Sequence, residues 1–256
     1  MDRVTEQPFT HRRALITGGA SGIGLATAQM LRRLGATVAV IDAAVAGPDG
    51  FLFAQADVTD DARIESAVTG LIAQLGGLDV LVNNAGLGAR GGVEDNPLDE
   101  WRRVLDVNVL GLVRVTRAAL PALRASGSAA IVNTCSIAAT AGLPQRALYS
   151  ASKGAVLSLT LAMAADLVQD GVRVNAVNPG TVDTPWVRRL LSASDDPVAE
   201  LAWLEARQPA GRLVSADEIA AAICYLASPA AGSTTGTALA VDGGMQGVRL
   251  PAPVRQ

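Results

Sequence analysis

Short apolar runs alternate with helical patterns along the whole chain, and this alternation constrains the fold more than any other feature. Seven apolar runs occur, at residues 14–16, 37–41, 51–53, 79–82, 130–132, 172–177 and 238–241. Between them lie amphipathic segments, such as residues 23–34 and 62–75, in which apolar residues recur at spacings of three and four. Alternating strands and helices imply a parallel sheet with right-handed crossovers and helices on both faces. We therefore expect a doubly wound α/β fold with a seven-stranded parallel sheet.

The length of 256 residues favours a single domain, residues 1–256, because one hydrophobic core extends to about 250–300 residues. Residues 184–212 interrupt the alternation with two short helical patterns around Pro197. An insertion after the carboxyl end of a strand lies where doubly wound folds bind ligands. We expect it to be a substrate lid. The C-terminal tail, residues 246–256, is expected to be frayed; alternatively, it reaches the active site of a neighbouring subunit.

Charge and composition favour a soluble protein that acts on a small molecule. The 21 basic and 24 acidic residues are scattered without long blocks, which argues against nucleic acid or an anionic membrane as partner. The longest uncharged stretch, residues 219–241, is broken by Pro229 and Gly232, unlike a membrane span. With only Cys135 and Cys224, no disulfide framework is expected, and we predict a cytoplasmic protein.

The first apolar run ends in a glycine-rich turn, Thr-Gly-Gly-Ala-Ser-Gly-Ile-Gly, at residues 17–24. Behind such a turn, backbone N–H groups and the positive end of a helix face the pyrophosphate of a dinucleotide, as in a Rossmann-type fold. The alternative explanation is an ordinary turn that uses glycine for positive φ. The predicted cofactor contacts in this turn are Gly18, Ser21, Gly22, Ile23 and Gly24.

Asp42 ends the second run, and its carboxylate is placed to accept hydrogen bonds from both hydroxyls of an adenosine ribose. The same charge repels a 2′-phosphate. Because Ala43 and Ala44 follow it and residues 19–21 contain no Lys or Arg, we expect NAD rather than NADP as cofactor. The alternative for Asp42 is a solvated carboxylate at a strand end.

Two further strand ends carry candidate cofactor residues. Asp57 and Val58 follow the third run and are placed to receive the adenine, and residues 83–86, Asn-Asn-Ala-Gly, follow the fourth. In the second group the predicted contacts are Asn83, Ala85 and Gly86. An ordinary turn explains this group equally well, because Asn side chains readily bond to neighbouring backbone.

Tyr149 and Lys153 lie four residues apart at the start of a helical pattern, so their side chains share one face. A nearby ammonium stabilises tyrosinate, the form that takes a proton from an alcohol. Ser136, just beyond the fifth run, is placed to hold the substrate oxygen. In isolation, a Tyr-x-x-x-Lys pair is commonly only a helix surface.

Taken together, these residues resemble the short-chain dehydrogenase/reductase family over nearly the whole chain. The resemblance rests on residues 17–24, 83–86, Asn108, Ser136, 149–153 (Tyr-Ser-Ala-Ser-Lys), 179–180 and 242–244. It implies that Tyr149 is the general acid/base, that Lys153 holds the ribose, that Ser136 binds the reacting oxygen and that Asn108 supports a water relay to Lys153. For Asn108, an alternative or additional role is to satisfy a helix kink.

The resemblance has further implications for the cofactor and the assembly. It adds Tyr149, Lys153, Pro179, Gly180, Val182 and Thr184 to the cofactor contacts, with Thr184 on the nicotinamide side. It also implies a homotetramer. His11 is the only histidine and precedes the first predicted strand, so we expect no histidine-based metal site and no Ser-His hydrolase.

Two arginines are candidates for reading the substrate. Arg146 lies three residues before Tyr149, and Arg207 lies at the end of the predicted lid. A guanidinium fork binds a carboxylate bidentately, although a surface arginine paired with Glu or Asp is the alternative for each. Arg90, between glycines in residues 86–92, is left open between a substrate contact and a mobile side chain.

The region from Arg146 onward also resembles the subgroup of cytosolic 3-hydroxybutyrate dehydrogenase and 2-keto-3-deoxy-L-fuconate dehydrogenase. That resemblance implies interconversion of a secondary alcohol and a ketone on a hydroxycarboxylic or sugar acid. One departure is that an arginine expected after Thr-Pro falls at Leu190, with Arg188 and Arg189 beside it.

Two rival functions remain open. One is a reductase of acyl-thioester or neutral carbonyl or sugar substrates on the same fold, for which Arg146 and Arg207 are incidental. A strong preference for NADPH would favour it and contradict the role expected of Asp42. The other is a non-catalytic dinucleotide-binding sensor, against which the presence of Ser136, Tyr149 and Lys153 argues.

Overall fold

The computed structural model describes residues 7–192 and 194–250 and contains one seven-stranded sheet. Its strand order is β3-β2-β1-β4-β5-β6-β9, and every neighbouring pair is parallel. The strands are β1 (Arg13–Thr17), β2 (Thr37–Asp42), β3 (Leu52–Gln55), β4 (Val80–Asn83), β5 (Ala129–Thr134), β6 (Val172–Pro179) and β9 (Ala238–Val241). The predicted doubly wound α/β fold is confirmed, and every predicted strand overlaps an observed one.

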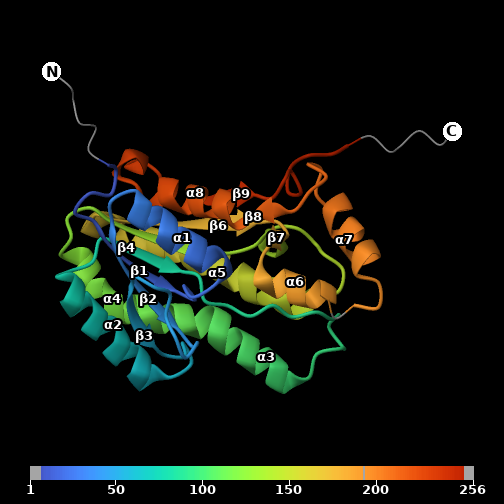
Figure 1. Cartoon of the computed structure of the whole chain (residues 1–256), viewed down its shortest axis with the longest axis horizontal. Coiled ribbons are helices and arrows are strands. Elements are labelled where there is room, and N and C mark those ends of the chain that lie inside the picture. Colours follow the sequence, from blue (N-terminus) through green and yellow to red (C-terminus); the bar gives the residue numbers. More distant parts are fainter. Residues whose placement is uncertain (1–6, 193, 251–256) are drawn as a thin grey trace.

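Helices cover both faces of the sheet (Figure 1). One face is covered by α1 (Gly22–Arg33) and α8 (Ala216–Ala227), which pack against each other. The other is covered by α2 (Asp61–Leu75), α4 (Gly111–Arg124) and α5 (Ala147–Leu167). Successive strand residues point to opposite faces, so Leu15 lies in one core cluster and Ile16 in the other. The strands are continuously apolar because neither face of the sheet meets water.

The strand order reverses at β1, which has β2 on one side and β4 on the other. At such a switch point the connections leave in opposite directions and open a crevice beyond the carboxyl ends of the strands. Thr17, Asn83 and Thr134 end β1, β4 and β5, so they reach this edge together. The crevice is where the fold favours a bound dinucleotide.

The segment of residues 184–212 holds two helices, α6 (Pro185–Ser192) and α7 (Pro197–Ala206), on either side of the region of Pro197. A second, two-stranded parallel sheet pairs β7 (Val182–Asp183) with β8 (Val214–Ser215) and thereby joins the two ends of this segment. The sequence patterns did not predict this small sheet, because two-residue strands are too short to show a periodicity.

The remaining elements are short. They are α3 (Leu98–Leu105), the π-helical turn η1 (Asp106–Leu110), and the 3-10 turns η2 (Ile137–Ala139), η3 (Val168–Asp170) and η4 (Pro229–Ala231). Within the predicted C-terminal tail, Gln246 contacts Thr140 through its side-chain oxygen, at 3.2 Å. Residues 251–256 of the tail lie outside the described residues.

One helix, Ala147–Asp170, is long and apolar enough to cross a membrane by length and composition alone. The core helix of a soluble protein passes the same test. This segment contains α5, which packs against β6 and carries the polar Tyr149 and Lys153. About a third of its most apolar window is buried, so α5 packs against the sheet on one side and is exposed on the other.

Candidate active site

The glycine turn between β1 and α1 adopts a backbone that needs its glycines. Gly18 and Gly22 have φ values of +64° and +53°, in the left-handed region. A Cβ on Gly18 would lie 2.9 Å from the Cα of Ala85, and a Cβ on Gly24 would overlap the carbonyl oxygen of Gly18. The turn, α1 and the end of β4 therefore lie too close together for a side chain at Gly18 or Gly24.

The amino end of α1 is free to bind an anion. Ser21 caps the helix in an extended conformation, but its side chain makes no capping hydrogen bond, and the first turn contains no acidic residue. The N–H groups of Gly22, Ile23 and Gly24 in this first turn and the positive helix end thus fit a pyrophosphate. Thr184 lies beside the turn, because a Cβ on Gly22 would be 3.5 Å from its methyl carbon.

Asp42 lies at the end of β2 with its carboxylate against the glycine turn. Its Oδ2 accepts a hydrogen bond from the Ala20 N–H and its Oδ1 from the Ala44 N–H, both at 2.9 Å. The side chain is only half-buried, and a carboxylate offers about four acceptor positions, so acceptor capacity remains for ribose hydroxyls.

Asp57 and Val58 lie between β3 and α2. Asp57 accepts hydrogen bonds from the N–H and the hydroxyl of Thr59, at 3.0 and 2.9 Å, and so forms a local turn. The Val58 side chain is buried against Gly111 at the start of α4, where a Cβ would lie only 2.7 Å from it. The Val58 side chain is therefore occupied by packing against the start of α4.

The two asparagines after β4 have different partners. The Asn83 side chain is buried and donates to Thr116 Oγ1 and Asn133 Oδ1, both at 3.0 Å, which directs it toward the protein interior. Asn84 donates instead to the carbonyl oxygens of Thr17 and Gly18, at 3.2 and 3.0 Å. Asn84, absent from the predicted contacts, is thus the residue whose side chain joins this turn to the glycine turn.

Tyr149 and Lys153 lie one turn apart near the start of α5, with the Lys153 Nζ 5.8 Å from the centre of the Tyr149 ring. Lys153 is buried and donates to the carbonyl oxygen of Thr134 at 2.8 Å. Among the described residues it has no carboxylate partner within ion-pair distance. Its charge is therefore available to the neighbouring tyrosine and to a ligand.

Ser136 follows β5 and caps the short η2 turn. Its Oγ accepts a hydrogen bond from the Ala138 N–H at 3.1 Å, which leaves the hydroxyl hydrogen free to donate. The side chain is buried at the same edge of the sheet as the Thr134 carbonyl that binds Lys153. The structure thus gathers Ser136, Tyr149 and Lys153 around the ends of β5 and α5.

Asn108 lies in the π-helical turn between α3 and α4, a type of distortion that often marks functional sites. It is buried; its Oδ1 accepts from the Leu87 N–H at 2.7 Å, and its Nδ2 donates to the Leu87 carbonyl at 2.9 Å and to Ser152 Oγ at 3.0 Å. Ser152 in turn donates to the Tyr149 carbonyl at 2.8 Å. The helix is distorted at Asn108, but the side chain bonds to Leu87 and Ser152 rather than to the backbone of its own helix, and the link through Ser152 was not predicted.

Gly86 brings this network next to the lysine. A Cβ there would lie 3.2 Å from Asn108 Oδ1 and 3.5 Å from Lys153 Nζ. The space beside Gly86 is therefore polar and faces both side chains, as the expected relay between Asn108 and Lys153 requires. Ala85, one residue earlier, is held by its N–H, which donates to Thr17 Oγ1 at 3.1 Å.

The last group of predicted cofactor residues follows β6. Pro179 ends the strand, and the Gly180 N–H donates to the Val241 carbonyl at 3.1 Å. Val182 is buried in the small sheet. Together these residues lead the chain to Thr184 at the glycine turn.

Arg146 lies directly before α5, where its Nη1 donates to the carbonyl oxygen of Ala89 at 3.0 Å. The backbone of Gly91 pairs with this segment, which holds the loop of residues 86–92 against the start of α5. Burial lowers the pKa of Arg146, and the charge of Arg90 lowers it further. Among the described residues, no carboxylate forms an ion pair with Arg146.

Arg207 lies at the end of α7 with its guanidinium 4.7 Å from the centre of the Trp203 ring. Burial lowers the pKa of Arg207, the charge of Arg146 lowers it further, and Glu200 opposes both effects. Like Arg146, it has no ion-pair partner in the described part of the chain. The fold thus leaves two half-buried guanidinium groups without an ion-pair partner in the described part of the chain, and one of them, Arg146, lies three residues before Tyr149.

In α6, Arg188 binds Asp183 through two hydrogen bonds of 2.7 and 2.8 Å, whereas Arg189 and Leu190 are exposed. Trp186 of the same helix lies against the loop of residues 86–92, because a Cβ on Gly88 would be only 2.6 Å from its ring. This aromatic wall was not predicted; a lone Trp after Pro carries no sequence signal for such a contact.

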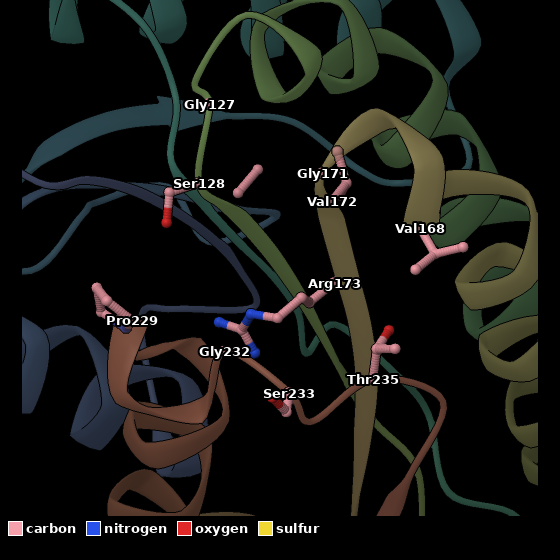
Figure 2. A pocket seen from close by; sticks show the side chains of 11 residues that line it. Gly127, Ser128, Val168, Gly171, Val172, Arg173, Pro229, Gly232, Ser233 and Thr235 are labelled. Carbon is pink, nitrogen blue, oxygen red and sulfur yellow. The ribbon is translucent and has the colours of Figure 1, made fainter.

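A separate hollow of about 400 Å³ lies at the other end of the strands, beside the amino ends of β5 and β6 (Figure 2). It is lined in part by Arg173, which donates to the carbonyl oxygens of Leu226, Ser228 and Thr234 at 2.7, 3.0 and 3.2 Å. These bonds satisfy the end of α8, so Arg173 has a structural role there. The hollow is remote from Tyr149.

Comparison with known proteins identifies the family. A family model described as enoyl-(acyl carrier protein) reductase matches residues 18–246. A cis-4-hydroxycyclohexanecarboxylate dehydrogenase of Sinomonas cyclohexanicum is 39% identical over 253 residues, which cover 94% of this chain and 99% of that protein. The chain belongs to the short-chain dehydrogenase/reductase family. As a member of it, the protein is an oxidoreductase that uses a nicotinamide dinucleotide and acts on secondary alcohols, which confirms the predicted enzyme class.

Two further similarities support this assignment. A 2-keto-3-deoxy-L-fuconate dehydrogenase of Xanthomonas campestris pv. campestris is 38% identical over 242 residues, 91% of this chain and 79% of that protein. The solved ligand-free aldohexose dehydrogenase of Thermoplasma acidophilum superposes with a TM-score of 0.90 at 30% identity, covering 98% of this chain and 99% of the other. The predicted subgroup resemblance is thus confirmed at the level of sequence similarity.

Proposed function

We propose that this short-chain dehydrogenase/reductase interconverts a secondary alcohol and a ketone on a hydroxycarboxylic or sugar acid, with NAD as cofactor. The observation that carries the proposal is that two half-buried guanidinium groups, those of Arg207 and of Arg146 three residues before Tyr149, have no ion-pair partner among the described residues. A half-buried guanidinium without a counter-charge is suited to bind an anion, and a substrate carboxylate supplies the missing charge. Two of the relatives described above are named for carboxylic acid substrates.

In the oxidation direction, the roles fall to four side chains. Ser136 and Tyr149 hold the alcohol oxygen, and Tyr149 takes the proton from it. Lys153 holds the ribose and stabilises the tyrosinate, while Asn108 keeps Leu87 and the polar space beside Gly86 in place. A bound nicotinamide would supply the acceptor for the hydride that leaves the alcohol carbon.

The proposed preference for NAD rests on Asp42. Its carboxylate lies against the glycine turn, where a 2′-phosphate would meet it, and Ala20 and Ala44 beside it supply backbone N–H groups rather than a cation. Like-charge repulsion in a half-buried position disfavours NADP. The other proposed cofactor contacts are the predicted residues of the glycine turn and of the segments that follow β3, β4 and β6.

We further propose a cytoplasmic homotetramer in which residues 184–212 form a substrate lid. Two buried, unpaired cysteines suit a reducing compartment. The outer face of α5 exposes Leu161, an apolar side chain that an oligomer interface would cover. Trp186 on α6 supports the lid, because it already contacts the loop of residues 86–92.

The test is a panel of hydroxy acids and matched neutral alcohols, assayed by the absorbance of NADH. Arg146→Ala should reduce kcat/KM on acids about a hundredfold, because it removes a charge-assisted bidentate contact, and should spare neutral alcohols. Arg189→Ala, which removes an exposed arginine of α6, is the matched control. Equal losses of Arg146→Ala on acids and alcohols would contradict the carboxylate role.

A second candidate function is that of a reductase whose substrate is carried as an acyl thioester or is a neutral carbonyl compound or sugar. The description of the matching family model favours it. Under this alternative Arg146→Ala leaves activity unchanged, and NADPH is preferred over NADH. The same panel, run with both cofactors, separates the two proposals.

A further inference from the structure

The hollow beside the amino ends of β5 and β6 is lined by hydrogen-bond donors, and none of the described residues that line it is acidic. Its volume of about 400 Å³ is within the range of small-molecule sites, about 300–1,000 Å³. Its polar side chains are those of Ser128, Arg173, Ser233 and Thr235. Figure 2 shows Arg173 reaching from β6 toward Gly232. One cation and three hydroxyl groups without a carboxylate are suited to bind an anion.

Arg173 is held in place and still has free donors. A guanidinium has five N–H groups. In Arg173, Nη1 donates to the carbonyl oxygens of Leu226 and Thr234, and Nη2 donates to that of Ser228. Nε and the second N–H of Nη2 have no partner among the described residues. The carbonyl groups therefore fix the guanidinium without neutralising its charge, which is the arrangement of a preorganised binding group.

A second guanidinium reaches the rim of the hollow from the segment before β1. Arg12 Nη2 donates to the Ser128 carbonyl oxygen at 2.6 Å and to Ser128 Oγ at 3.4 Å. Arg12 Nε is buried and has no hydrogen-bond partner in the described part of the chain. Because Ser128 lines the hollow, an anion on its hydroxyl lies close to the Arg12 charge. Burial lowers the pKa of Arg173 and the charge of Arg12 lowers it further, as expected for neighbouring cations.

The carboxylates in the segments around this hollow have other partners. Asp170, one residue before the lining residue Gly171, pairs with Arg124 at 2.7 Å. Asp79, which precedes β4, pairs with Arg13 at 2.8 Å. The two arginines of the hollow form no ion pair with any described residue. Their positive charge is thus not compensated by the described part of the protein.

We propose that this hollow is a second ligand site, separate from the site of Tyr149, which binds a small molecule through a phosphate group. A phosphate dianion matches the charge of Arg12 and Arg173, and its oxygens can accept from donors on several sides. A carboxylate has one charge and only two oxygens. Ser128 and Thr235 donate through their hydroxyl groups; Thr235 Oγ1 accepts from the backbone of β6 at 3.1 Å, which leaves its hydrogen free.

The site lies at the opposite ends of the strands from the reacting groups. β5 begins beside the hollow and ends two residues before Ser136, and β6 begins beside the hollow and ends at Pro179. A bound anion therefore contacts neither the cofactor nor the substrate. It should stabilise the folded protein by mass action and leave the KM of both unchanged.

The experiment is a calorimetric titration with inorganic phosphate at constant ionic strength, with excess NADH present to occupy the glycine turn. The native protein should bind phosphate saturably. Arg12→Gln should weaken binding about tenfold or more, because it removes a charged donor, and Ser128→Ala should weaken it about fivefold. Arg103→Gln is the matched control and should leave the affinity unchanged, because Arg103 is an exposed residue of α3, remote from the hollow in the sequence and the fold.

A second pair of variants tests the charge of the hollow without an added ligand. Ser233→Glu places a carboxylate in the lining, and Ser233→Gln is its neutral match. In a phosphate-free buffer of low ionic strength, the thermal midpoint of Ser233→Glu should be about 2 °C above that of Ser233→Gln. Phosphate should bind at least tenfold more weakly to Ser233→Glu, because the new carboxylate takes its place and repels it.

Three results would overturn the inference. They are equal phosphate affinities of Arg12→Gln and Arg103→Gln, equal thermal midpoints of the two Ser233 variants, and competition of phosphate with NADH or substrate that persists unchanged in Arg12→Gln. If the thermal midpoint shows that Arg12→Gln has lost its fold, Ser128→Ala takes its place, because the shorter bond from Arg12 goes to the backbone carbonyl and is retained. The function proposed above is tested by Arg146→Ala and does not depend on this outcome.

Discussion

Replacing Asn108 with alanine tests the connection between the π-helical turn and the reacting groups. The substitution removes three hydrogen bonds, two with the backbone of Leu87 and one with Ser152, all 2.7 to 3.0 Å long and all in a buried site. Each contributes about 1 kcal/mol, and the Leu87 N–H and carbonyl lose their partner. We expect the free energy of unfolding to fall by about 3 kcal/mol, which lowers the thermal midpoint by roughly 6–12 °C.

The loss of kcat should be larger than the loss that reduced stability alone would cause. Leu87 follows Gly86, whose Cβ position lies 3.5 Å from Lys153 Nζ, so a loosened Leu87 shifts the space beside the lysine. A misplacement of about 1 Å near the reacting groups costs on the order of a hundredfold in kcat. Calorimetry at matched protein concentration gives the midpoint, and NADH absorbance gives kcat.

Asn108→Asp is the informative companion variant. Its carboxylate still accepts from the Leu87 N–H but, when ionised, cannot donate to the Leu87 carbonyl or to Ser152. It should therefore be no more stable than Asn108→Ala at neutral pH. An alanine variant within 1 kcal/mol of the native protein, with unchanged kcat, would refute the reasoning.

Three further predictions concern the glycine turn, acid stability and the thiols. Gly24→Ala should weaken NAD binding at least tenfold in a titration, because its Cβ overlaps the Gly18 carbonyl oxygen; unchanged affinity would contradict the close packing of the turn. Burial alone would raise the pKa of Asp79, but hydrogen bonds from Arg13 hold it at about 2, below its unfolded value near 3.9. The resulting stability is present above about pH 4 and is lost as the pH falls toward 2, so Asp79→Asn should flatten acid unfolding curves by about 2 kcal/mol. Burial raises the pKa of the Cys224 thiol to about 12, so a disulfide reagent should modify it only after unfolding, and rapid labelling of the native protein would contradict its burial.

Much of the fold was predictable because the signals for it are local. Strands buried on both faces must be continuously apolar, and the runs at residues 37–41 and 172–177 match β2 and β6 at their first residues. The predicted strand ends were less accurate than the predicted strands. The apolar run at residues 51–53, for example, corresponds to β3, which extends from Leu52 to Gln55. The small sheet of β7 and β8 was missed because its pairing joins residues about thirty positions apart.

In the candidate site too, some contacts could be predicted from the sequence and others could not. Tyr149 and Lys153 could be placed on one face because helix periodicity alone brings them together, and the glycine turn could be placed because it follows a strand. The contacts of Asn84 with Gly18 and of Ser152 with Asn108 could not, because their partners come from separate elements. The spacing of residues along the chain does not give the distance between two elements that become neighbours only in the folded sheet.

By itself, the sequence determined the doubly wound sheet, the family and the set of reacting side chains, since each depends on periodicity or on residues close in the chain. Only the tertiary structure decided that Arg146 and Arg207 have no ion-pair partner among the described residues while Arg90 pairs with Glu200. These groups come from the loop of residues 86–92, the start of α5 and the helix α7, which are far apart in the sequence, so their partners are set only by the fold. The charge of the substrate site is therefore a property of the fold.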